Sequence, residues 1–103
     1  MVTRDISFLR DLEDIIRARL AERPDSSYTA ELAADGERRV AQKLGEEATE
    51  LALAAVAGSR DEQLEEGADL VFHLLVLLSV KGIELADVVD VLRRRHRTQL
   101  VER

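Results

Sequence analysis

The chain has 103 residues, a formal net charge of −6 and no cysteine. This length allows one hydrophobic core and so a single domain, 1–103. The missing cysteines exclude disulfides, thiolate zinc sites and a cysteine nucleophile, and the acidic balance argues against general nucleic-acid binding, which favours a basic face. With 46% hydrophobic residues, 3% aromatic residues and one proline, the composition is typical of packed helices. We expect an all-α fold, with four to five helices forming a bundle.

No segment has the character of a leader or a membrane span. Residues 1–10 carry charges throughout and contain no apolar stretch, unlike a signal peptide. The longest apolar run, residues 70–80, includes His73 and Ser79 and is shorter than the ~20 residues that a span needs. We therefore expect a cytoplasmic protein with no membrane partner.

The first third of the chain predicts a long helix and a short one. Apolar residues recur at helical spacing from Phe8 onward, and the helix should end near Arg23, because Pro24 disfavours helix in the residue before it. In the loop that follows, Ser26 or Ser27 caps a short helical turn that runs on to Leu32.

Two long helices are expected in the middle of the chain. After a break at Asp35-Gly36, the first covers residues 37–57 and stops at Gly58. The second covers residues 61–80. It begins with the capping-box spacing of Ser59 and Glu62 and is closed by Lys81 and a left-handed glycine, Gly82.

The second of these helices is apolar at nearly every position from Leu70 to Leu78. A helix that is apolar all round is buried on all sides, which a monomer of this size rarely achieves. We therefore expect a homodimer in which this core helix packs against its symmetry mate. A last helix is expected over residues 85–97, with three side chains facing inward: Val88, Val89 and Leu92.

Two acidic motifs, Glu46-Glu47-Ala-Thr-Glu50 and Glu66-Gly-Ala-Asp69, fall in the two middle helices. Positions three and four apart share a helix face, so each helix projects a pair of carboxylates. If the helices pack antiparallel, four carboxylates meet across a seam, and without a counterion some of them must take up protons. A hard divalent cation, Mg²⁺ or Mn²⁺, would turn the cluster into an oxygen-ligand site. The arrangement points to phosphate chemistry.

The alternative is a solvated face, since glutamate-rich helix faces are common. Two observations favour the metal site without excluding this alternative. Glu46 and Glu50 are a like-charge pair four residues apart, which is mildly destabilising on a plain surface. Asp69 adjoins the apolar run, where an unpaired carboxylate is costly.

Basic residues near these motifs each have two interpretations. Lys43 forms either a salt bridge one turn along its helix or a contact to a substrate phosphate. His73 is either a half-buried core residue or a partner that orients Asp69. The run 93–97 either neutralises the C-terminal end of the last helix or meets a polyanion.

The two acidic motifs resemble the signature of the MazG-like all-α nucleotide pyrophosphohydrolases. Four segments resemble, more narrowly, the phosphoribosyl-ATP pyrophosphohydrolase family: residues 27–32, 42–47, 68–78 and 92–96. The resemblance extends from about Phe8 to His96. It implies a homodimeric α-helical enzyme that hydrolyses phosphoribosyl-ATP to phosphoribosyl-AMP and pyrophosphate in histidine biosynthesis. In some organisms this activity is fused to a cyclohydrolase whose zinc site uses cysteines, so we expect the monofunctional form here.

Site roles follow from combining the motifs with this resemblance. The expected metal ligands, for Mg²⁺ with Mn²⁺ as a substitute, are Glu47, Glu50, Glu66 and Asp69. Glu46 is the candidate catalytic residue that orients or deprotonates water. The expected phosphate contacts are Lys43, Arg94 and Arg95. The resemblance alone suggests Tyr28 and Thr29 as ribose or base contacts.

Two departures from the family and two rival functions remain. Glu84 stands where a small capping residue is expected, which predicts a weak start to the last helix, and Phe72 stands where many relatives carry tyrosine. The first rival is a house-cleaning hydrolase of nucleoside triphosphates. The second is a non-enzymatic helical interaction module, which predicts no more than weak surface binding of divalent metals.

Overall fold

The computed structural model describes residues 4–102, with side chains as far as Arg97. Five helices follow one another in the described part, and no strand occurs there: α1 (Phe8–Glu22), α2 (Tyr28–Ala34), α3 (Glu37–Ala57), α4 (Arg60–Val80) and α5 (Leu85–Glu102). The all-α expectation is confirmed, and the helix bounds lie close to those expected, except that the last helix continues to Glu102 instead of ending at Arg97. None of the described helices combines the length and apolar character needed to cross a membrane.

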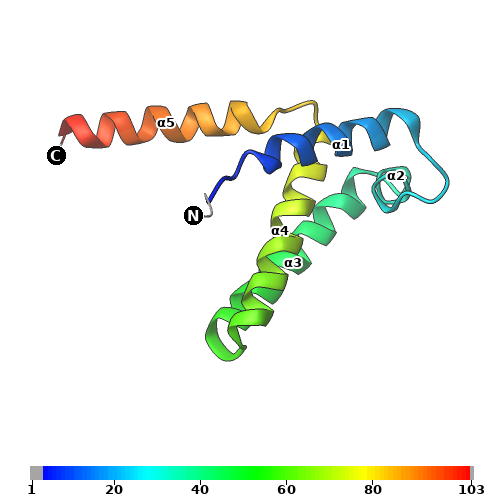
Figure 1. Ribbon diagram of the computed structural model, residues 1–103, viewed down its shortest axis with the longest axis horizontal. Coiled ribbons are helices and arrows are strands. Elements are labelled where there is room, and N and C mark those ends of the chain that lie inside the picture. Colours follow the sequence, from blue (N-terminus) through cyan, green and yellow to red (C-terminus); the bar gives the residue numbers. More distant parts are fainter. Residues whose placement is uncertain (1–3, 103) are drawn as a thin grey trace.

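Helices α3 and α4 form a long antiparallel hairpin, and α1 and α2 pack across one end of it (Figure 1). The core lies where these four helices meet, and each of them contributes to it. Its buried members are Ile16, Leu32, Val40, Leu75 and Val76. The remaining length of the hairpin, up to its tip at Gly58, extends beyond this core and carries the acidic motifs.

The helix caps follow the expected side-chain chemistry. Ser27 caps α2, because its hydroxyl oxygen accepts a hydrogen bond from the Ala30 N–H at 3.2 Å. Ser59 and Glu62 form the full capping box at the start of α4. Gly82 has φ +71° just after α4, a conformation that a glycine adopts without steric cost. These caps set the start of α2 and both ends of α4.

Helix α5 differs from the expectation that its apolar side chains face inward. It leads away from the other helices (Figure 1), so that Val89 is 37% exposed and Leu92 is 47% exposed. The inward orientation is therefore wrong for Val89 and Leu92 in the single chain, whereas Val88 is half-buried. Similarly, α4 is not buried on every side, because Val71 is exposed while Leu75 and Val76 are buried. The apolar pattern identifies which side chains are apolar on each face, but the described residues do not cover these faces.

The start of α5 is held by residues other than Glu84. The carboxylate of Glu13, a buried residue on α1, accepts a hydrogen bond from the Leu85 N–H at 2.6 Å. The Asp87 carboxylate accepts another from the Glu84 N–H at 2.9 Å. Two N–H groups that a helix start leaves without intrahelical partners are thus satisfied, and the weak start that Glu84 suggested is compensated.

Replacing Glu13 tests this attachment. Because losing a side-chain cap costs about 1 kcal/mol, Glu13→Ala should speed hydrogen exchange at the Leu85 amide about fivefold. Glu13→Gln keeps an oxygen acceptor and should exchange close to the wild-type rate. Amide exchange followed by NMR measures both, and an unchanged rate in Glu13→Ala would show that the contact does not anchor α5.

Candidate active site

The acidic motifs meet because of their register in the hairpin. Glu50 and Glu66 each lie eight residues from Gly58 (58 − 50 and 66 − 58), and Glu47 and Asp69 each lie eleven (58 − 47 and 69 − 58). Residues equidistant from the turn of an antiparallel hairpin lie opposite one another. Accordingly, carboxylate oxygens of Glu47, Glu66 and Asp69 all lie within 4.8 Å of one another.

Two oxygens of this cluster lack a partner. Oε2 of Glu47 and Oε2 of Glu66 are buried and accept no hydrogen bond within the described residues. Glu47 as a whole is only 5% exposed. Unsatisfied buried carboxylate oxygens are costly, and hard divalent cations take such oxygens as ligands. The donor set therefore fits Mg²⁺ or Mn²⁺.

Glu50, the fourth expected ligand, is not among the three converging carboxylates, but it interacts with Glu66. The pKa of Glu66 is raised to about 7, first by hydrogen bonding with the Glu50 carboxyl group, and then by burial and by the negative charges of Glu50, Glu47 and Asp69. In the protein without a cation, Glu66 therefore keeps its proton to near neutral pH.

This raised pKa predicts how the metal-free protein responds to pH. Glu66 has a pKa of about 7 when folded against an ordinary value of 4.5, so between these values the folded state binds more protons than the unfolded state. Stability therefore falls as pH rises through this window and levels off above it. Besides the carboxylates, the charged or titratable side chains nearby are Lys43 on α3 and His73 on α4.

Melting temperatures measured in EDTA between pH 5 and pH 8 test this prediction. The wild-type value should fall across the window, and Glu66→Gln should flatten the profile, because an amide does not titrate. A wild-type profile as flat as that of Glu66→Gln would contradict the assignment of the proton to Glu66.

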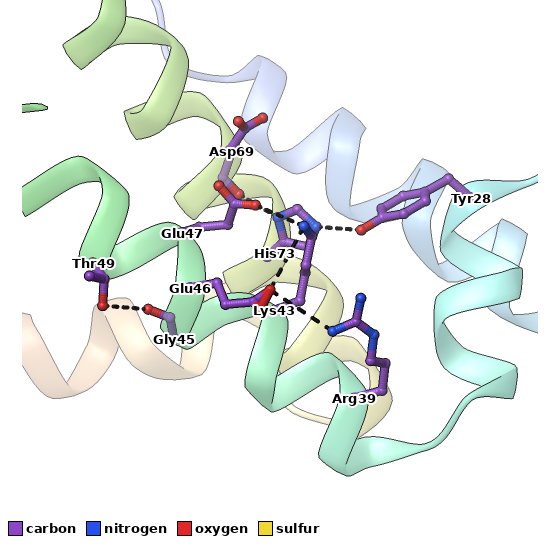
Figure 2. Close-up of polar contacts among 9 residues, drawn as sticks. All are labelled: Tyr28, Arg39, Lys43, Gly45, Glu46, Glu47, Thr49, Asp69 and His73. Atoms are coloured by element: carbon purple, nitrogen blue, oxygen red, sulfur yellow. Dashed lines mark hydrogen bonds and ion pairs between the residues drawn. The ribbon is translucent and has the colours of Figure 1, made fainter. Parts of the chain in front are cut away.

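Basic side chains flank the cluster on α3. Lys43 Nζ lies 3.4 Å from Glu47 Oε1 and 4.0 Å from Glu46 Oε1, and the hydrogen bond to Glu47 is the main cause of a raised Lys43 pKa. Arg39 Nη1 lies 3.9 Å from Glu46 Oε1. The expected salt bridge of Lys43 is therefore present, with Lys43 between Glu46 and the cluster (Figure 2).

Arg39 was not among the expected site residues. The sequence does indicate its position, because Arg39, Lys43 and Glu47 follow one another at intervals of four residues and so share a helix face. Glu46 points toward Arg39 rather than toward Asp69 (Figure 2). It therefore stands beside the three converging carboxylates and not among them.

His73 connects the cluster to α2. Its Nδ1 lies 2.8 Å from the backbone oxygen of Asp69, and its Nε2 lies 2.9 Å from the hydroxyl of Tyr28 (Figure 2). A carbonyl oxygen can only accept, so Nδ1 carries the proton and Nε2 accepts from the Tyr28 hydroxyl. His73 is buried, as in the core-histidine interpretation, and it contacts the backbone of Asp69 rather than its carboxylate.

The remaining expected contact residues lie farther from the cluster or are covered. Thr29 is buried within the packed end of the molecule. Arg94 and Arg95 are exposed on α5, which leads away from the α3–α4 hairpin (Figure 1). The single chain therefore brings Lys43 to the acidic cluster but not these two arginines.

Comparison with known proteins identifies the family of the chain. Residues 9–96 match the phosphoribosyl-ATP pyrophosphohydrolase family. The chain belongs to this family. The match includes all the acidic residues of the cluster, the flanking Lys43, and His73.

Several relatives of the chain carry the name histidine biosynthesis bifunctional protein HisIE. That of Vibrio parahaemolyticus is 50% identical over 90 residues, covering 87% of this chain and 43% of the relative. That of Xylella fastidiosa is 51% identical over 90 residues, covering 87% and 44%. That of Escherichia coli is 48% identical over 89 residues, covering 86% and 44%. The chain thus spans less than half the length of these relatives.

Proposed function

We propose that this chain hydrolyses phosphoribosyl-ATP to phosphoribosyl-AMP and pyrophosphate, as a step of histidine biosynthesis. The observation that carries the proposal is the meeting of three carboxylates from α3 and α4 within 4.8 Å, in a chain that belongs to the family of this name. A cytoplasmic location is proposed together with this pathway.

Glu47, Glu66 and Asp69 would hold Mg²⁺, with Mn²⁺ as a substitute, and Glu50 would join them once the proton on Glu66 is released. A divalent cation bound there supplies the positive charge that a triphosphate needs on a protein of net charge −6, and lowers the pKa of a bound water. The buried oxygens of Glu47 and Glu66 that lack hydrogen-bond partners support this assignment.

Glu46 is the proposed proton acceptor. Its side chain is partly exposed beside the cluster and is held by Lys43 and Arg39, so its carboxylate can take a proton from water without leaving the helix face. The water oxygen attacks the α-phosphorus, the bond to the bridging oxygen breaks, and pyrophosphate leaves with that oxygen.

Lys43 is the proposed phosphate contact within the chain. Its ammonium already lies between two carboxylates, where it can exchange part of this pairing for a phosphate oxygen as negative charge builds up. Arg94 and Arg95 lie on α5, away from this site (Figure 1). Their contribution to substrate binding would require the α5 helix of a second copy.

A homodimer is part of the proposal. The radius of gyration is 15.8 Å, against about 13 Å for a compact domain of this length. The accessible surface is 7834 Å², against about 5,800 Å² for a compact monomer of this mass. Exposed apolar side chains on the hairpin, such as Leu53, Val56 and Leu64, are available for a contact with a second copy.

The mass in solution tests the dimer. Light scattering on the purified protein should give twice the chain mass of 11.5 kDa. A mass of one chain at micromolar concentration, with the activity intact, would contradict the dimer.

A substrate panel tests the activity against its nearest rival. Purified protein should release pyrophosphate from phosphoribosyl-ATP and should act far more slowly on ATP and dITP. Turnover of ATP or dITP instead would favour a nucleotide-cleansing hydrolase on the same site. Turnover of none of the three, with no specific binding of Mn²⁺, would favour the interaction module.

A further inference from the structure

Tyr28, the first residue of α2, is an aromatic residue that His73 links to the acidic cluster (Figure 2). It is 47% exposed, and its hydroxyl reaches His73, 45 residues further along the chain. His73 in turn donates its Nδ1–H to the backbone oxygen of Asp69. One imidazole ring therefore separates Tyr28 from the backbone of a proposed metal ligand.

The hydroxyl of Tyr28 is engaged by this contact. Its single proton is donated to Nε2 of His73, because Nδ1 holds the imidazole proton. Tyr28 can therefore offer a ligand its ring face and an acceptor lone pair, but no hydroxyl proton.

The ring of Tyr28 packs against the rings of Phe72 and His73. The centroids of Tyr28 and Phe72 are 6.2 Å apart at an interplanar angle of 31°, and those of Tyr28 and His73 are 5.8 Å apart at 89°. Phe72 and His73 contact each other at 5.2 Å and 89°. Such tilted and edge-to-face contacts are favourable for aromatic pairs. They leave Tyr28 oriented rather than free to rotate.

We propose that His73 is a positioning residue that holds the ring of Tyr28 beside the metal cluster as a stacking surface for the purine base of the substrate. This proposal rests on the proposed function. When the triphosphate lies at the carboxylates, the nucleoside attached to its α-phosphorus lies beside them, within reach of an aromatic face on α2. A purine attached at N1 to a second ribose carries a positive charge near neutral pH, and a tyrosine face attracts such a cation.

Steady-state kinetics with phosphoribosyl-ATP separate the ring from the hydroxyl. Stacking of a base on an aromatic ring corresponds to roughly a 10- to 100-fold change in affinity, so Tyr28→Leu should raise KM by this factor and change kcat by less than threefold. Tyr28→Phe keeps the ring and loses one neutral hydrogen bond, which predicts a KM about two- to tenfold higher. Phe8→Leu, an exposed aromatic residue at the start of α1, is the matched control and should behave as wild type.

The role of His73 is tested through the same hydrogen bond. His73→Leu should raise KM about as much as Tyr28→Phe, and the double variant should be no worse than the worse single one, because both remove one interaction. His73→Gln keeps an acceptor for the hydroxyl and should restore much of the loss. It also keeps the test valid if the leucine variant does not fold. KM effects that multiply in the double variant would show that His73 does not act through Tyr28.

Fluorescence gives a test that does not depend on turnover. The chain has one tyrosine and no tryptophan, so its tyrosine emission reports Tyr28 alone. Phosphoribosyl-AMP, which carries the purine, should quench this emission in the presence of Mg²⁺, and pyrophosphate should not. Free N-acetyltyrosinamide corrects for absorption by the nucleotide. Active wild-type protein with no quenching by phosphoribosyl-AMP, or with an unchanged KM in Tyr28→Leu, would overturn this proposal and leave the proposed function standing.

Discussion

Glu47→Gln is expected to lose at least about 100-fold in turnover of phosphoribosyl-ATP while keeping its helical fold. Glu47 is the most buried carboxylate of the cluster, and its Oε2 has no partner within the described residues. Replacing partners that merely orient metal ligands already costs about 10- to 100-fold, so replacing a proposed ligand should cost no less. Asp69→Asn should behave in the same way.

Stability measurements distinguish a lost metal site from a damaged fold. In EDTA, Glu47→Gln should melt close to wild type, because the substitution loses the ion pair with Lys43 but also removes a buried charge with one unpaired oxygen. Adding Mn²⁺ should raise the wild-type melting temperature and not that of the variant, since a ligand that binds only the folded state stabilises it.

The matched control for Glu47→Gln is Glu65→Gln, on an exposed residue of α4 next to the cluster. It removes the same charge without removing a proposed ligand, and should retain wild-type turnover. Near-normal turnover in both Glu47→Gln and Asp69→Asn would remove these residues from the metal site.

Ile16→Ala is expected to destabilise the fold by about 2–5 kcal/mol, the usual cost of such a truncation in a packed core. Ile16 is 1% exposed on α1 and lies in the cluster that joins α1 to α2, α3 and α4. Single domains are stable by only about 5–15 kcal/mol in total. The variant should therefore melt much lower, and its activity should disappear with folding rather than at the site.

The neighbouring residue provides the control. Ile15 is of the same type but 45% exposed, so Ile15→Ala should cost well under half as much. Urea unfolding of both variants measures the difference. Equal destabilisation by the two substitutions would show that the packed end of the hairpin is not where the core lies.

The hairpin and its acidic cluster were predictable because both are determined by local sequence. Ser59 and Glu62 mark the start of α4, and Gly58 lies at the short turn. This turn then sets Glu50 opposite Glu66 and Glu47 opposite Asp69. Helical spacing and a two-residue connection are enough to derive the meeting of these side chains.

Contacts between distant elements could not be derived in this way. The hydrogen bond from Tyr28 to His73 depends on how α2 crosses α4, and that from the Leu85 N–H to Glu13 depends on how α5 leaves the bundle. Neither of these helix orientations is determined by residues close to each other in the sequence. The sequence identifies the apolar side of α5, but a hydrophobic pattern does not show what covers that side. The prediction that Val89 and Leu92 face inward is therefore wrong for the single chain.

The most direct test of the central claim is pyrophosphate release from phosphoribosyl-ATP by the purified protein, measured in EDTA and again after Mg²⁺ is added back. The account predicts no release in EDTA, fast release with Mg²⁺, and none with Mg²⁺ in Glu47→Gln. Release that is equally fast in EDTA would contradict it, because the carboxylates of α3 and α4 would then not act through a divalent cation.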